Sequence, residues 1–217
     1  MATTRSTLAA GSRRLVRFDA VQRGAHWVSA SMFLVLIATA IPLYFGSLFG
    51  LVLPRFGVEQ LHLWTGVALP VPLAVSTLGP WGARMRRDLG RISVWRREEL
   101  VWVRSLGRSL IATDKFNPGQ KLNAIVVGAA SALLLATGIV LKWFGYFPLS
   151  WRAGSTFVHV VVAWLVVLVL AGHVVMALTH REALSSMVHG RVSERWAVTH
   201  APAWWREEVD AGPRPEG

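Results

Sequence analysis

Long apolar segments without a charged residue divide the chain into four similar stretches. They run from Gly24 to Pro54, Gln60 to Ala83, Leu122 to Leu141 and Ala153 to His180, and are 31, 24, 20 and 28 residues long. A helix needs about 20 residues to cross the hydrocarbon core of a bilayer. The pattern therefore predicts an all-α integral membrane protein with four transmembrane helices, at 25–47, 59–79, 122–144 and 153–178.

Two features modify this simple picture. Pro70 and Pro72 fall inside the second span, where membrane helices tolerate proline with a kink. The stretch Arg91–Ala112, between the second and third spans, mixes apolar residues with several arginines. It suits an amphipathic helix on the membrane surface or a basic loop that only enforces topology, and the sequence favours neither.

The composition narrows the possible functions. Of 217 residues only 16% are charged, yet Lys and Arg number 23 against 12 Asp and Glu. A nucleic-acid-binding domain with this basic balance would have a higher charged fraction, so no nucleic-acid partner is expected. There is no cysteine, which excludes disulfides, thiolate zinc, cysteine-held iron–sulfur clusters and covalently attached c-type haem in this chain.

The distribution of the cations predicts the orientation. Twenty of the 23 Lys and Arg lie in the two termini and the loop 80–121, and three lie on the other side. Positive residues accumulate in cytoplasmic loops, so both termini should be cytoplasmic. The expected organisation is an N-terminal tail (1–22), a membrane domain (23–180) and a C-terminal amphipathic segment with its tail (181–217), of which Gly212–Gly217 should be disordered.

Four of the seven histidines lie within or at the ends of the apolar spans, where an ionisable group suggests function. His159 and His173 share the fourth span and are 14 residues apart, about 21 Å along a helix and within about 40° of the same face. His62 lies near the outer end of the second span and His26 near the inner end of the first. The pattern therefore predicts an outer pair, His62 with His159, and an inner pair, His26 with His173.

Two imidazoles from facing helices can be the axial ligands of one haem iron, and one b haem in each leaflet would form a transmembrane electron path. Structural zinc needs four ligands at one point, which two separated pairs do not supply. A proton relay would need acidic partners within the spans, and only Glu59 lies at an edge. Small residues beside these histidines would let a flat haem approach, or they only allow the helices to pack closely. They are Ala25, Gly66, Ala163 and Gly172.

Several sequence stretches resemble the cytochrome b (gamma) subunit of respiratory formate dehydrogenases, of the cytochrome b561-like family. The histidine segments that carry the resemblance are RFDAVQRGAHW, ELHLWTG, STFVHVVVAW and AGHVVMALTH. Two more specific stretches are DKFNPGQKLN (Asp114–Asn123) and SSMVHGRVSERWAVTHAPAWWRE (Ser185–Glu207). The similarity extends from about Arg17 to Glu208.

The resemblance implies partners and a quinone site. It implies a bacterial inner-membrane protein with two b haems, fed on the outer side by an iron–sulfur subunit with its own membrane anchor. A molybdenum- or tungsten-containing subunit would oxidise formate, which this chain alone would not do. The matching quinone residues are Asn117, Gly119, Gln120 and the inner ligand His173, with menaquinone or ubiquinone as substrate. The same turn also suits an N-cap, with Pro118 at the helix start.

Two alternatives remain from the sequence. The chain could serve a hydrogenase or another molybdoenzyme, because the histidines and four spans also suit those cytochromes. It could also be a haem-free scaffold that only anchors a periplasmic enzyme.

Overall fold

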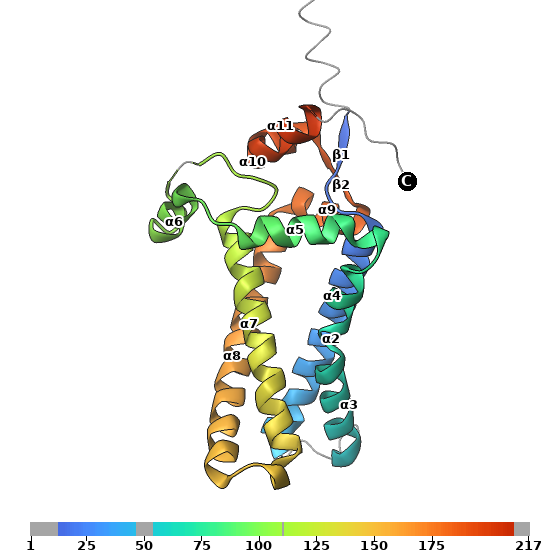
Figure 1. Ribbon diagram of the computed structural model, residues 1–217, viewed down its shortest axis with the longest axis vertical. Helices are drawn as coiled ribbons and strands as arrows, with labels where there is room; N and C mark the ends of the chain where they lie inside the picture. Colours follow the sequence, from blue (N-terminus) through green and yellow to red (C-terminus); the bar gives the residue numbers. More distant parts are fainter. Residues whose placement is uncertain (1–12, 47–53, 110, 211–217) are drawn as a thin grey trace, which may run out of the picture. The chain divides into compact units, whose positions relative to one another are not determined.

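The computed structural model describes residues 13–46, 54–109 and 111–210, so the expected tail Gly212–Gly217 lies outside it (Figure 1). The chain forms two compact units. The apolar unit comprises the described residues within Gly24–Ala83 and Val126–Gly172, and the polar unit comprises those within Met1–Arg23, Arg84–Ile125 and His173–Gly217. The three longest helices each contribute residues to both units.

Those three helices are long and apolar enough to cross a membrane. They are α2 (Ala20–Tyr44), α7 (Pro118–Lys142) and α8 (Leu149–Thr179). A fourth span is present if Arg55–Ser76 and Pro80–Ser93, bent by 93° at a short break, count as one. The predicted helical membrane protein is thus confirmed, with three or four candidate spans in the described residues.

The second predicted span is interrupted at its prolines. Helix α3 (Arg55–Ala68) ends one turn before α4 (Val71–Ser76), whose N-cap residue is Pro70. A proline has no backbone N–H and clashes with the preceding turn, so the regular hydrogen-bond ladder stops there. Two short 3₁₀ turns complete the apolar unit, η2 (Pro80–Gly82) and η3 (Phe144–Tyr146).

The polar unit is built from short elements that come from distant parts of the chain. Strand β1 (Arg14–Val16) pairs antiparallel with β2 (Arg191–Ser193), and Leu15 lies opposite Val192. The helices are α5 (Ala83–Ser93), α6 (Arg97–Arg104), α9 (Arg181–His189), α10 (Glu194–His200) and α11 (Pro202–Asp210). Residues near both ends of the chain therefore fold into one structure.

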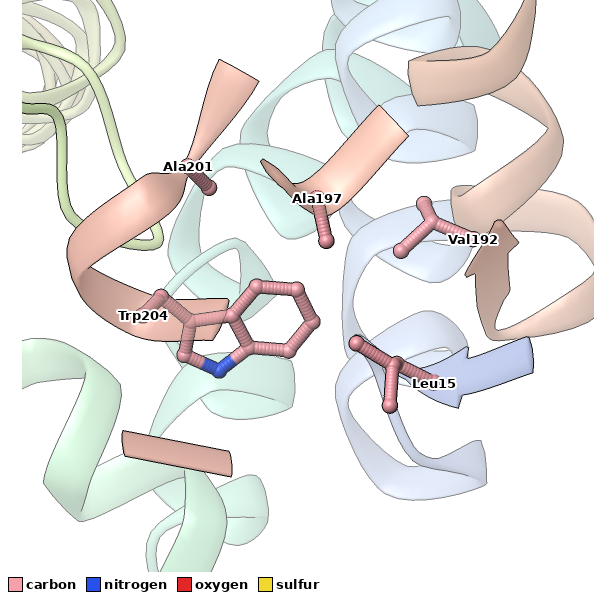
Figure 2. Close-up of a cluster of buried hydrophobic side chains, with 5 residues drawn as sticks. All are labelled: Leu15, Val192, Ala197, Ala201 and Trp204. Atoms are coloured by element: carbon pink, nitrogen blue, oxygen red, sulfur yellow. The ribbon is translucent and has the colours of Figure 1, made fainter. Parts of the chain in front are cut away.

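A small hydrophobic core holds this unit together (Figure 2). Trp204 of α11 is 1% exposed and packs with Leu15, Val192, Ala197 and Ala201. Full burial of one large apolar side chain stabilises a fold by about 1.5–3 kcal/mol. The core thus joins β1, β2, α10 and α11, so the C-terminal segment is a folded part of the unit.

A glycine is required where α9 ends. Gly190 has a φ of +83°, and its carbonyl accepts hydrogen bonds from the backbone N–H groups of Arg17 and Phe18. A Cβ at this position would lie 2.6 Å from both the Phe18 carbonyl oxygen and an Arg23 guanidinium nitrogen. Any other residue would therefore be strained and would push the two segments apart.

The stretch Arg91–Ala112 is helical in part, at the end of α5 and in α6, and both forms expected from the sequence stay predictions. Helix α5 ends at Ser93, α6 covers only Arg97–Arg104, and Leu106 and Gly107 follow with positive φ angles of 53° and 84°. Glu99 of α6 is 5% exposed, so part of this stretch packs inside the polar unit. Contact of its outer face with a membrane stays a prediction.

Candidate functional site

The outer histidine pair predicted from the sequence comes together in the apolar unit. His62 of α3 and His159 of α8 have ring centres 6.5 Å apart, with 58° between the ring planes. Both rings are half-buried. The two helices belong to different parts of the sequence, so the approach of these imidazoles is a result of helix packing.

Each of these imidazoles has a threonine partner from a neighbouring helix. Thr39 Oγ1 of α2 lies 2.8 Å from His62 Nδ1. Thr137 Oγ1 of α7 lies 2.9 Å from His159 Nδ1. Both threonines are buried, at 7% and 8% exposure. Four helices thus meet around one histidine pair.

The threonines determine which ring nitrogen remains available. Each hydroxyl donates to a backbone carbonyl of its own helix, Thr39 to Val35 at 2.7 Å and Thr137 to Leu133 at 2.8 Å. The hydroxyl oxygen then accepts the proton of the imidazole Nδ1, which leaves the Nε2 lone pair free. A neutral imidazole whose second nitrogen is held this way is the usual form of a metal-ligating histidine.

The geometry fits a metal ion or haem iron held between two axial histidines. With metal–imidazole bonds of about 2 Å, and about 1.1 Å from nitrogen to ring centre, opposite ligands have ring centres about 6 Å apart. The observed 6.5 Å agrees with that spacing. The described residues contain no group of three or more His, Cys, Asp or Glu that could hold a metal ion.

Small residues leave space beside the pair, as the sequence predicted for some of them. Gly66 lies one turn after His62, and a Cβ there would meet only a Leu36 methyl group at 3.7 Å. Gly138 was not predicted, yet a Cβ on it would lie 3.5 Å from the His159 ring. A flat macrocycle could therefore approach both ligands closely, and the residues present fit a bis-histidine haem.

The two histidines of the predicted inner pair belong to different units. His26 belongs to the apolar unit, and its ring meets the edge of Trp27 with centres 5.3 Å apart. His173 belongs to the polar unit and is exposed. The pairing of these two histidines stays a prediction from their helix positions.

The turn before α7 forms a reciprocal cap. The backbone N–H of Gln120 donates to Asn117 Oδ1 at 2.9 Å, and the N–H of Asn117 donates to Gln120 Oε1 at 3.1 Å. Pro118 is the first helical residue and is fully buried. The N-cap interpretation is therefore confirmed. Because the amide oxygens are the acceptors in the cap, the two side-chain NH₂ groups are not used there and can donate elsewhere.

Buried charges surround the segment that leads into this turn. Asp88 of α5 is 4% exposed and accepts hydrogen bonds from Lys115 Nζ and, at 2.6 Å, from Gln22 Nε2. Arg17 Nη2 donates to the Lys115 carbonyl at 3.0 Å, and its guanidinium lies 4.5 Å from the Trp196 ring centre. Sequence reasoning missed this network, because its members are far apart in the chain.

Burial and neighbouring charges shift the pKa values of three cations in this network. Burial lowers the pKa of Lys115, against the opposing effect of Asp88. Burial likewise lowers the pKa of Arg17 to about 10. For Arg91, burial alone would lower the pKa, but a hydrogen bond to Glu207 and the charges of three carboxylates together raise it. Arg17 and Arg91 therefore remain cationic near neutral pH.

Known proteins similar to this chain include cytochrome b556 subunits of formate dehydrogenases. The cytochrome b556(Fdn) subunit of the nitrate-inducible formate dehydrogenase of Escherichia coli K12 is 25% identical over 210 residues, which are 90% of this chain and 92% of that subunit. The cytochrome b556(fdo) subunit of formate dehydrogenase of the same organism is 24% identical over 89% of this chain and 92% of its own.

A third relative comes from Haemophilus influenzae. Its formate dehydrogenase cytochrome b556 subunit is 24% identical over 90% of this chain and 84% of its own length. The family model described as prokaryotic cytochrome b561 matches residues 17–190, which include all four candidate ligands. With its apolar helices and its threonine-held histidine pair, this chain belongs to the prokaryotic cytochrome b561 family.

Proposed function

We propose that this chain is a dihaem cytochrome b subunit that carries electrons across the bacterial inner membrane to a quinone. The observation that carries the proposal is the facing pair His62 and His159, with Nδ1 of each ring held by a threonine. His62 and His159 would be the axial ligands of an outer b haem, and His26 and His173 those of an inner one. Bound haem supplies reversible one-electron chemistry at its iron.

The partner that supplies electrons is proposed from the relatives. Those relatives are named as subunits of formate dehydrogenases. A chain without cysteine cannot hold an iron–sulfur relay of its own. We therefore assign it to a formate dehydrogenase complex with an anchored iron–sulfur subunit and a molybdenum or tungsten catalytic subunit. The relatives' names favour this over a hydrogenase or another molybdoenzyme.

The quinone site is proposed at the turn before α7, near the cytoplasmic face. The NH₂ groups of Asn117 and Gln120 and the backbone N–H of Gly119, which lies in the first helical turn, are donors suited to a quinone carbonyl. His173 would lie beside the quinone as the inner ligand. Electrons arriving from outside and protons taken up from inside would then move charge in the same sense and build a membrane potential.

Haem content tests the electron path. We expect two b haems per chain in a pyridine haemochrome assay of the complex. His62→Ala should reduce this to one, because an iron with one axial histidine is held far less firmly. His189→Ala changes an exposed histidine outside both proposed pairs and is the matched control, expected to keep two. A haem-free wild-type protein would favour the scaffold alternative, and two haems in His62→Ala would remove His62 from the ligands.

A variant that keeps the cap but removes the donor tests the quinone site. Asn117→Asp retains an oxygen that can accept the Gln120 N–H, but it has no NH₂ group. The loss of one such hydrogen bond should slow quinone reduction roughly five- to tenfold. Formate-driven reduction of the haems, followed by their spectra, should be unchanged. Wild-type quinone kinetics in this variant would remove Asn117 from the site.

A further inference from the structure

The turn proposed to bind quinone has a buried lysine on each side. Lys115, two residues before Asn117, is 6% exposed and pairs with Asp88 of α5. Lys121, directly after Gln120, is 3% exposed, and its Nζ lies 2.7 Å from Glu99 Oε1 of α6. Lysine is almost never fully buried unless it is paired. Two such lysines on either side of five residues therefore indicate a segment that is held from both ends.

The second pair connects α6 firmly to the start of α7. Lys121 Nζ also donates to the Val94 carbonyl at 2.9 Å, just before α6. The other carboxylate oxygen of Glu99 accepts the backbone N–H of Arg96 at 2.9 Å and caps α6. Glu99 therefore both caps the N-terminus of α6 and pairs with Lys121, the lysine next to the turn. Breaking the Lys121–Glu99 pair would leave a buried charge without its partner.

The indole of Trp102, also on α6, lies against the turn itself. A Cβ on Gly119 would be 3.4 Å from the Trp102 ring and 3.3 Å from Asn117 Oδ1. The turn therefore lies between the indole and its own capping amide, with little space for a side chain at position 119. Trp102 is half-buried, in contrast to the exposed Val101 beside it.

We propose that Glu99, Lys121 and Trp102 are positioning residues, through which α6 holds the Asn117–Gln120 turn in the geometry that binds quinone. The reciprocal cap orients the two amides on their own helix, but it does not fix the turn within the polar unit. The ion pair and the indole supply that second constraint. This inference rests on the proposed quinone function of the turn. It adds α6, which carries no proposed quinone ligand, to the parts that determine quinone affinity.

Glu99→Gln in the purified complex is the sharpest test. Glutamine can still accept the Arg96 N–H in the cap of α6, but it cannot neutralise Lys121. A turn that is displaced or mobile should raise the KM for quinone roughly tenfold and change kcat less than twofold. Haem content and formate-driven haem reduction should equal those of the wild type. Glu98→Gln, at the exposed neighbouring position on α6, should keep the wild-type KM.

A double variant separates a joint role from two independent ones. In Glu99→Gln/Lys121→Met both charges are gone, and the long apolar stem at position 121 is kept. If the pair acts as a unit, the KM of the double variant should be no higher than that of Glu99→Gln. Trp102→Leu tests the same turn without changing a charged residue. It should raise the KM for quinone several-fold.

The outcomes distinguish this inference from the proposed function. Slower quinone reduction in Asn117→Asp, with wild-type KM in Glu99→Gln and Trp102→Leu, would keep the quinone site and overturn the positioning role of α6. A general loss of haem, or a fall of kcat alone in Glu99→Gln, would also overturn it, because it would indicate a purely structural role. Wild-type kinetics in Asn117→Asp would contradict the quinone site itself.

Discussion

The apolar and polar units both bury polar side chains, but they satisfy them in different ways. In the apolar unit Thr39 and Thr137 donate to carbonyls four residues earlier in the same helix, and each then meets a single neutral imidazole. In the polar unit the groups are charged, and their partners are distant in sequence. Arg17 bonds to the Lys115 carbonyl, and Arg91 binds Glu207 at 2.6 Å.

The difference follows from the surroundings of each unit. Within a bilayer no water can satisfy an unpaired group, so neutral, short-range hydrogen bonds are the least costly arrangement. They leave one nitrogen of each imidazole free, which suits a ligand site. Charges can be buried in the polar unit where opposite charges pair, as in Lys115–Asp88 and Lys121–Glu99. Other ion pairs connect the two ends of the chain with the central loop.

Removal of the central carboxylate should have the largest effect. Asp88→Asn leaves Lys115 buried without its counter-charge, so we expect a loss of about 3–5 kcal/mol in the free energy of unfolding. Thermal unfolding of the purified complex, followed by circular dichroism, measures this.

The control for Asp88→Asn is an exposed ion pair of the apolar unit. Arg55 and Glu59 are 72% and 41% exposed in their side chains, so Glu59→Gln should cost no more than about 1 kcal/mol. Equal effects of the two variants would contradict the view that the polar unit depends on its buried charges.

Removal of a threonine hydroxyl in the apolar unit should have a smaller and different effect. Thr39→Val keeps the side-chain shape but leaves His62 Nδ1 without its acceptor, so affinity for the outer haem should fall roughly tenfold. The unfolding temperature of the polar unit should not change. Haem loss to an acceptor protein and a redox titration measure the effect, and the outer haem should become easier to reduce.

Thr156→Val is the matched control for this variant. Thr156 lies on α8 and, like Thr39 on α2, donates to the carbonyl four residues before it, that of Arg152, at 2.9 Å. It is exposed, and no histidine contact of its hydroxyl is found in the described residues. The haem affinity of the Thr156→Val variant should equal that of the wild type. A similar loss in both variants would mean that the back-bonded hydroxyl stabilises the helix and not the imidazole.

The sequence predicted the features that depend on one helix at a time. Charge-free windows indicated the helices, Pro70 indicated where one is interrupted, and Asn117 with Pro118 indicated the start of α7. The approach of His62 to His159 was also predictable, because each has a definite depth in its span. The inner pair and the orientation of the termini stay predictions.

Three-dimensional packing decided which side chains from distant segments contact one another. Thr39 and Thr137 looked like ordinary helix residues, and nothing in their local sequence indicated which histidine each would meet. Asp88 is one of several charges in a basic loop, and the termini gave no sign of β1 pairing with β2.

The sequence by itself determined the class of protein and the positions of its candidate ligands along their spans, because helix length and the cost of burying charge in a membrane are local properties. Only the tertiary structure decided which nitrogen of each outer histidine is free and which buried charges hold the turn before α7. Those properties depend on contacts such as Thr39 with His62 and Glu99 with Lys121, which form between segments that the chain brings together only when it folds.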